Sequence, residues 1–99
     1  MLVKAIKLVS GEELVTEVVH ENESEIGVKN PLAIVIQRQQ DGNLGIGFVP
    51  FAPYLPKDTL IRLKVDKTTF CLEVDDQMRN QYNSIFGGII TPPKQLLVS

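Results

Sequence analysis

The side chains that most often perform chemistry are few in this 99-residue sequence and lie far apart along it. His20 is the one histidine and Cys71 the one cysteine. A nucleophilic cysteine needs a base beside it, and a metal site needs several ligands. We interpret His20 as a partly exposed structural residue, with a metal or acid–base role as the alternative. Cys71 lies between Phe70 and Leu72 and is interpreted as a small filler of a strand rather than a reactive thiol.

Two other patterns superficially suggest chemistry. The run of residues 42–47, GNLGIG, resembles a phosphate-binding loop, but such a loop joins a strand to a helix, and no helix pattern follows here. In the pair Glu12-Glu13 the two carboxylates point to opposite faces of a strand, and the pair Asp75-Asp76 is placed to begin a helix. We therefore predict a protein that is not an enzyme and that needs no cofactor and no metal.

Charge and composition narrow the class of protein further. The formal net charge is −2, and residues 1–25 carry six glutamates against two lysines. This balance disfavours a dedicated duplex-binding protein, because phosphate neutralisation needs a positive excess. The glutamates of residues 12–25 are interpreted as a solvated face, with a site for a cation or a basic partner as the alternative. With 43% hydrophobic and 22% charged residues, one globular domain over residues 1–99 is expected.

The expected compartment is the cytoplasm. A single cysteine forms no internal disulfide, which favours a reducing environment. Lysines interrupt the apolar stretch in MLVKAIKLVSGEELV, so we expect neither a signal peptide nor secretion. No apolar run approaches the roughly 18 to 20 residues of a membrane-spanning helix, and no membrane partner is expected.

Short segments rich in Val, Ile, Leu and Thr, separated by Gly and Pro, predict a mainly β protein. The expected strands are residues 2–9, 12–20, 26–29 and 32–38, with further strands marked by alternating apolar residues around 44–48, 61–65 and 70–74. We expect a break at Asn30-Pro31 and a hairpin at Asp41-Gly42. The apolar pieces 89–90 and 96–98 are expected to be edge strands or subunit contacts.

One helix is predicted near the carboxyl end. Four apolar residues fall at helical spacing: Val74, Met78, Tyr82 and Ile85. Asp75 or Asp76 is expected to cap the start of the helix and Gly87 to end it. Together these elements predict a strongly bent antiparallel sheet that forms a small closed or nearly closed barrel with one C-terminal helix.

The segment FVPFAPYLP, residues 48–56, combines aromatic side chains with three prolines, which excludes it from the centre of a sheet. The candidate contacts with a partner or a second subunit are Phe48, Phe51, Tyr54 and Leu55. Two alternatives stay open. These side chains could pack over the end of the barrel, or they could stack on single-stranded bases.

Four phrases of this sequence, KLVSGEELVTEV, VKNPLAI, GIGFVPFAPYLP and the helix ending in QYNSIFGG, resemble small Sm-like proteins of tailed phages of marine cyanobacteria. This resemblance implies a strongly bent five-stranded barrel and a homo-oligomeric ring formed by pairing of edge strands. Gly11 stands where the Sm pattern has a glycine opening the second strand, and Thr16 stands where the pattern has a second glycine.

Many Sm-like proteins bind single-stranded, uridine-rich RNA at the inner rim of the ring. The residues that the resemblance suggests for such a rim are Asn22, Ser24, Lys29 and Arg38. Symmetry in a ring would also bring Lys64 or Lys67 together. The loop corresponding to the family's first RNA motif, residues 22–25, is acidic here, and no arginine precedes a glycine.

We therefore predict a homo-oligomeric ring that serves as a phage-encoded assembly or adaptor protein. RNA binding of the chaperone type is the alternative. The expected partners are further copies of the chain, then single-stranded RNA, or a phage or host protein. The expected location is the host-cell cytoplasm or the phage particle. Physics supports the oligomer independently, because pairing around a ring removes exposed strand edges.

Overall fold

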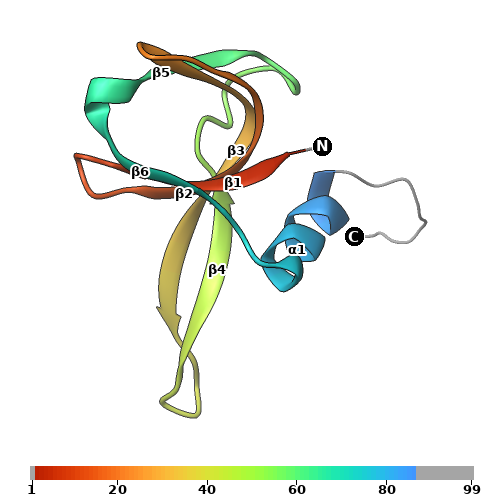
Figure 1. The fold of residues 1–99 in the computed structure, drawn as a ribbon. Helices are drawn as coiled ribbons and strands as arrows, with labels where there is room; N and C mark the ends of the chain where they lie inside the picture. Colours follow the sequence, from red (N-terminus) through yellow and green to blue (C-terminus); the bar gives the residue numbers. More distant parts are fainter. Residues whose placement is uncertain (1, 87–99) are drawn as a thin grey trace.

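The computed structural model describes residues 2–86, which form six strands, one short 3₁₀ helix and one α-helix (Figure 1). In chain order these elements are β1 (Val3–Leu8), β2 (Glu13–Glu21), β3 (Glu25–Arg38), β4 (Leu44–Pro50), β5 (Ile61–Lys64), η1 (Val65–Lys67), β6 (Thr68–Glu73) and α1 (Asp76–Phe86). The predicted antiparallel, mainly β architecture with one C-terminal helix is confirmed. The apolar pieces 89–90 and 96–98 and the predicted helix end at Gly87 lie outside the described residues.

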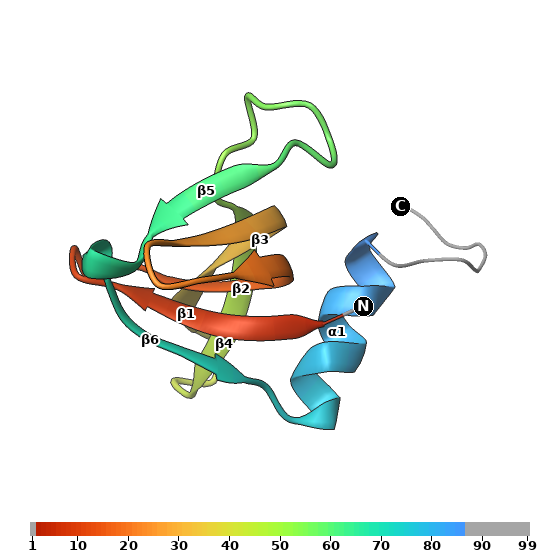
Figure 2. The same ribbon diagram turned by 45° about the horizontal axis from the view of Figure 1, so that its top comes forward.

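The strands form one antiparallel sheet in the order β4-β3-β2-β1-β6, and β5 pairs with β3 (Figure 2). The prediction of five strands was wrong by one. Since β2 takes one edge of β3, both β4 and β5 pair with its other edge. Residues 25–28 of β3 pair with β5 and residues 32–38 with β4. Within residues 2–86, no pairing joins β6 to β4 or β5, so hydrogen bonding does not close the sheet. The prediction of a strongly bent, closed or nearly closed barrel was therefore wrong: the strands form an open antiparallel sheet.

The predicted break at Asn30-Pro31 was wrong, because β3 runs through it. Asn30 has a φ of 53°, in the left-handed region that asparagine tolerates better than most residues. Pro31 has no N–H to give to a ladder. These two residues fall between the part of β3 that pairs with β5 and the part that pairs with β4. The Asn30-Pro31 pair, which predicted the end of a strand, therefore marks the point where β3 changes its partner from β5 to β4.

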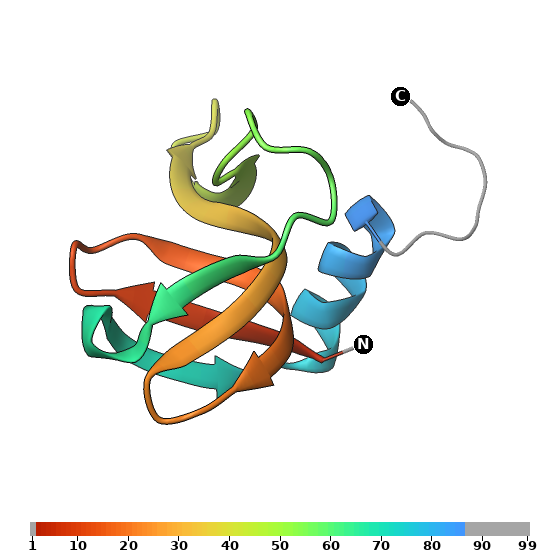
Figure 3. The ribbon, with the colours of Figure 1, turned by 90° about the horizontal axis from the view of Figure 1, so that it is seen from above.

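The sheet buries apolar side chains on both of its faces. On one face Ile6, Leu14, Val18, Ile26 and Val28 form a cluster. On the other face, which we call the helix side, Val3, Val15 and Leu32 pack with Tyr82 of α1. Figure 3 shows α1 lying across the sheet rather than continuing it. Because each face of the sheet buries one of these clusters, β1, β2 and β3 carry apolar side chains on both faces.

Helix α1 begins where the sequence predicts. The Asp75 carboxylate accepts a hydrogen bond from the Met78 amide at 2.9 Å, which satisfies one of the free donors of the first turn. Met78 and Tyr82 pack on the sheet as expected. Ile85 does not, and Phe86 takes its place, with its ring centroid 5.2 Å from that of Tyr82. The buried stripe thus follows the four-residue spacing of 78, 82 and 86.

Tyr82 ties the helix to β3 at the exchange of partners. Its side chain is buried, and its hydroxyl lies 2.9 Å from the carbonyl oxygen of Asn30 and 3.1 Å from that of Lys29. The same oxygen accepts a hydrogen bond from the Glu17 amide at 3.2 Å. The buried Thr16 hydroxyl also donates to the Lys29 carbonyl at 2.8 Å. Where the register of β2 and β3 is irregular, backbone N–H and C=O groups lack a partner in the ladder. The hydroxyls of Tyr82 and Thr16 form hydrogen bonds with these groups instead.

Burial raises the pKa of Tyr82 to about 12 from its ordinary value of 10.0. Above pH 10 the unfolded chain releases this proton while the folded chain keeps it. The contribution of Tyr82 to stability is therefore complete below pH 10 and is lost as the pH rises toward 12. We expect the difference in free energy of unfolding between wild type and Tyr82→Phe to shrink by up to about 1.4 kcal/mol per pH unit in this window. Urea unfolding from pH 9 upward measures it.

At neutral pH the same substitution removes the hydroxyl and should cost about 1–3 kcal/mol, because buried backbone groups lose their partner. Tyr54→Phe is the matched control, since the Tyr54 side chain is 83% exposed. It should change stability by less than about 0.5 kcal/mol at any pH. A Tyr82→Phe effect that is independent of pH would contradict the burial of this hydroxyl in a neutral state.

Candidate functional site

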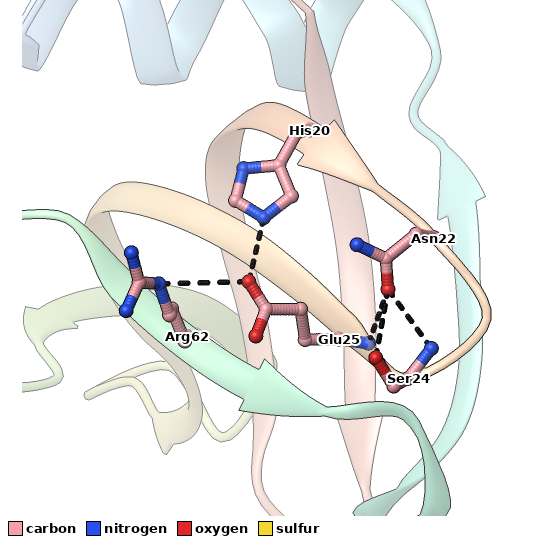
Figure 4. Close-up of polar contacts among 5 residues, drawn as sticks. All are labelled: His20, Asn22, Ser24, Glu25 and Arg62. Atoms are coloured by element: carbon pink, nitrogen blue, oxygen red, sulfur yellow. Dashed lines mark hydrogen bonds and ion pairs between the residues drawn. The ribbon is translucent and has the colours of Figure 1, made fainter.

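The turn between β2 and β3 contains Asn22 and Ser24, two of the predicted RNA-rim residues (Figure 4). The Asn22 side-chain oxygen accepts hydrogen bonds from the Ser24 amide at 2.9 Å, the Ser24 hydroxyl at 3.0 Å and the Glu25 amide at 2.9 Å. The backbone N–H of Asn22 in turn donates to the backbone carbonyl of Glu25 at 3.0 Å. Asn22 thus acts first as the residue that shapes the turn.

A charged cluster adjoins this turn. The Glu25 carboxylate lies between His20 and Arg62, as Figure 4 shows, with Oε2 2.8 Å from His20 Nε2 and 3.5 Å from Arg62 Nε. All three side chains are partly exposed. The expectation that His20 is a partly exposed residue beside acidic side chains agrees with this placement. Sequence analysis did not indicate that Arg62, on β5, joins this cluster.

Gly27 makes room for the His20 ring. His20 and Gly27 are opposite each other in the β2–β3 ladder, next to a register shift that follows Val18. A Cβ on Gly27 would lie 2.3 Å from His20 Cε1, far inside van der Waals contact. A glycine inside a strand often marks such a close approach. Gly27 is thus a positioning residue that sequence analysis missed, although its place in the strand EIGVK was a usable signal.

Basic side chains of β5 flank the cluster. In the ladder Arg62 is opposite Gly27 and Lys64 is opposite Glu25, so both lie on the face that carries Glu25. Both are exposed. The β5 end is held to the turn by the hydrogen bond from the Val65 amide to the Ser24 carbonyl at 3.0 Å. Arg62 and Lys64 therefore lie next to the turn, together with the Glu25 carboxylate, which is paired with Arg62.

Lys29 and Arg38 are placed elsewhere on β3. Lys29 is beside the exchange of partners, opposite Glu17. Arg38 is nine residues further on, a distance of roughly 30 Å in an extended strand. It lies at the far end of the β3–β4 hairpin, where its Nη1 donates to the Gly42 carbonyl at 3.3 Å. In Figure 1 this hairpin and the β2–β3 turn are at opposite ends of the sheet. One copy of the chain brings Asn22 and Ser24 together, but not Lys29 or Arg38.

The predicted contact residues of the proline-rich segment divide into two kinds. Phe48 and Phe51 are partly buried and pack against the two apolar clusters. Tyr54 and Leu55 are exposed. The segment is attached to β3 by reciprocal hydrogen bonds between Asn30 and Asp58, at 2.8 and 2.9 Å. Any contact made by this segment must therefore use Tyr54 and Leu55 first.

A cavity of about 310 Å³ opens beneath this segment. Its lining is mostly apolar and consists of Asn30, Pro31, Pro50, Ala52, Pro53, Leu55, Pro56, Lys57, Thr59, Ile61 and Phe86. The volume is at the lower limit of small-molecule sites. Its polar lining is largely occupied, since Asn30 binds Asp58 and the Thr59 hydroxyl donates to the Pro56 carbonyl at 2.6 Å.

The chemistry available at Cys71 is limited by its surroundings. Burial, and then the negative charge of Glu21, raise the pKa of the Cys71 thiol. Glu21 itself is paired with Lys4 at 2.5 Å, and its hydrogen bond raises the pKa of that lysine. A raised pKa disfavours the thiolate, which is the nucleophilic form. This environment fits a thiol that fills space beside the core.

Two surveys of residues 2–86 add to this picture. No group of three or more His, Cys, Asp or Glu side chains in this range is arranged to hold a metal ion. No helix in the same range has the length and apolar character needed to cross a membrane.

A scan of the sequence against protein-family models finds no match, and a search of curated proteins finds no relative. The resemblance to Sm-like proteins therefore stays a prediction. The proposed function therefore rests on the geometry of the sheet and its turns.

We expect Gly27→Ala to displace the His20 ring and to destabilise the protein by about 1 kcal/mol, the lower end of the cost of overpacking, because the ring is the end of a partly exposed side chain that can move. In a His20→Ala background the same change should cost less than about 0.5 kcal/mol, because nothing then occupies the space. Urea unfolding of the four proteins measures this coupling. An equal cost in both backgrounds would show that the His20 ring does not rest on Gly27.

Proposed function

We propose that this chain is a non-enzymatic, self-assembling β protein of the Sm-like type, which forms a homo-oligomeric ring through its sheet edges and serves as an assembly or adaptor protein. The observation that carries the proposal is the pair of open edges. Strands β4 and β5 together form the edge on one side of the sheet and β6 forms the other, and within residues 2–86 none of the three has a strand on its outer edge.

Such edges favour association with another chain. An edge strand presents unpaired N–H and C=O groups, and soluble proteins usually protect it with charge, proline or a covering segment. Here the edge strands instead carry exposed apolar side chains, among them Leu44 and Ile46 on β4 and Leu72 on β6. A head-to-tail contact between the two different edges is heterologous, and such contacts close into rings when the rotation permits.

The arrangement around β3 supports the Sm-like assignment. A five-stranded barrel of that family would have one strand along this edge of β3, where β4 and β5 lie in sequence here. Residues 51–60 separate the two strands and would then be an insertion into that single strand. The exposed Tyr54 of this insertion is a suitable aromatic anchor for a phage or host protein in the adaptor role.

Hydrogen exchange measured by mass spectrometry tests the edge contact. We expect peptides covering β4 and β6 to exchange more slowly at micromolar than at low nanomolar protein concentration, by at least tenfold. Peptides from β2 are the internal control, since β1 and β3 pair with both edges of that strand. Exchange in β4 and β6 that does not depend on concentration would refute assembly through these edges.

Single-stranded RNA binding is the second candidate function. It is favoured by the two cations of β5, Arg62 and Lys64, beside the turn that holds Asn22 and Ser24. A ring would repeat this arrangement around its axis and multiply the local positive charge. Glu25 opposes it by binding Arg62, so the expected affinity depends strongly on salt.

We expect a labelled oligouridine to bind the wild-type protein at about 50 mM salt and much more weakly at about 200 mM. Arg62→Gln should weaken binding and lower the salt slope by about 1, the signature of one lost phosphate contact. Arg79→Gln, on α1, is the control and should leave the slope unchanged. Fluorescence anisotropy measures all three proteins. Absence of saturable binding to wild type at low salt would exclude this function.

A further inference from the structure

Helix α1 covers only the middle of the helix side of the sheet. On the β3–β4 hairpin, Ile34 and Phe48 are opposite each other and pack into the cluster with Tyr82. The next pair outward on the same face is Ile36 and Ile46, whose side chains are 65% and 57% exposed. Leu44 follows them on this face. We call Ile36, Leu44 and Ile46 the hairpin patch. It extends the buried cluster beyond the reach of the helix.

The opposite face of this hairpin has a different character. Gly45 and Gly47 lie there, and the side chains of Gln37 and Gln39 rest over them, so that a Cβ on either glycine would touch an amide. Toward its tip the hairpin is therefore polar on this face and apolar on the helix side, whereas nearer the rest of the sheet the first face also carries Val35 and Val49. Because the polar face is already covered by the chain's own glutamines, the apolar helix side is the face that needs a partner.

A second uncovered patch lies on the helix side at the other edge of the sheet. Leu72 is opposite Ala5 in the β1–β6 ladder, two residues before Val74, which packs into the helix-side cluster. Phe70 precedes Leu72 on the same face. Leu72 is 61% exposed and Phe70 is also exposed. We call Phe70 and Leu72 the β6 patch. Each open edge thus carries its own apolar patch, and both patches are on one side of the sheet.

The charges beside the two patches are opposite. Arg38 is opposite Leu44 in the β3–β4 ladder, and no carboxylate of residues 2–86 lies within 4.0 Å of its guanidinium. Lys7 is opposite Phe70 of the β6 patch but is paired with Glu13 at 3.7 Å, and the patch is followed in the chain by three acidic residues, Glu73, Asp75 and Asp76. Asp75 is engaged in capping the helix, whereas the Asp76 side chain is 91% exposed although it binds Arg79. Asp76 is thus the acid best placed to pair with a cation from outside.

We propose that the hairpin patch of one copy packs against the β6 patch of the next copy, with Arg38 paired to Asp76 across the contact. This inference rests on the proposed self-assembly and names the surfaces that join. The contact buries side chains that otherwise remain in water at both edges. It assigns Arg38 to the subunit interface rather than to an RNA rim. The opposite charges favour hairpin patch on β6 patch over hairpin patch on itself, where two arginines would meet.

Charge reversal in the full chain tests the pairing. We expect Arg38→Glu and Asp76→Lys each to raise the dissociation constant of the assembly at least tenfold. An equimolar mixture of the two variants should recover assembly into even-numbered or open oligomers, because alternation of the two variants restores opposite charges at every contact, whereas an odd-numbered ring would keep one contact between like variants. Lys57→Glu and Asp66→Lys, both exposed and outside the two patches, are the matched controls and should assemble as wild type does. Sedimentation velocity measures the assemblies, and thermal unfolding of each variant verifies its fold.

The apolar part of the contact has its own test. Ile46→Ser should weaken assembly without lowering the stability of the isolated fold, since the side chain is exposed there. Tyr54→Ser, an exposed residue outside both patches, should leave assembly unchanged.

These outcomes distinguish a failure of the proposed contact between the patches from a failure of the proposed self-assembly. A wild-type chain that stays monomeric at all concentrations refutes self-assembly and this contact together. A wild-type oligomer that tolerates Arg38→Glu, Asp76→Lys and Ile46→Ser leaves edge assembly standing and refutes the contact alone. Failure of the mixture to recover assembly, when both single variants are folded monomers, also refutes the pairing of Arg38 with Asp76.

Discussion

The hydroxyl of Tyr82 makes the contact on which the rest of the architecture depends. It meets β3 at Lys29 and Asn30, where the backbone turns into the left-handed region and the strand exchanges β5 for β4 as its partner. Carbonyl groups at such an irregularity would be costly to bury without donors. The helix supplies one hydroxyl and Thr16 supplies another. Helix α1 is therefore required for the sheet to have its present form, and it packs where the sheet is least regular.

The division of β3 between two partner strands determines which apolar surface and which strand edge remain exposed. Because β5 takes the first part of one edge, β4 pairs only with the second part, and the two form a hairpin that extends beyond the cover of α1. Its apolar helix side and the open edge of β4 follow from this arrangement. Within residues 2–86 no strand pairs with the outer edge of β6, after which the chain continues into the helix. The features that favour association with a second copy are thus consequences of the same constraint that organises the core.

Much of this fold could be predicted from alternation and turn residues. The hairpin at Asp41-Gly42, the exclusion of residues 50–56 from a central strand and the cap at Asp75 were all evident in the sequence. The continuity of β3 through Asn30-Pro31 was not, because it depends on Tyr82, 52 residues away from Asn30. The site around Glu25 was found only in part. Asn22 and Ser24 lie in a turn that the sequence marks, whereas Arg62 reaches Glu25 through strand pairing and Gly27 admits the His20 ring through a register shift.

Assembly of several copies through β4 and β6 is the proposal on which the suggested functions of this chain depend. Native mass spectrometry of the protein as purified from cells is the decisive experiment. We expect one dominant closed oligomer with a mass that is an integral multiple of the chain mass. Oligonucleotide bound to that ring would favour the RNA-binding function, and a ring without nucleic acid would favour the adaptor. A monomer as the only species would contradict the account, because both open edges would then be compatible with an isolated chain.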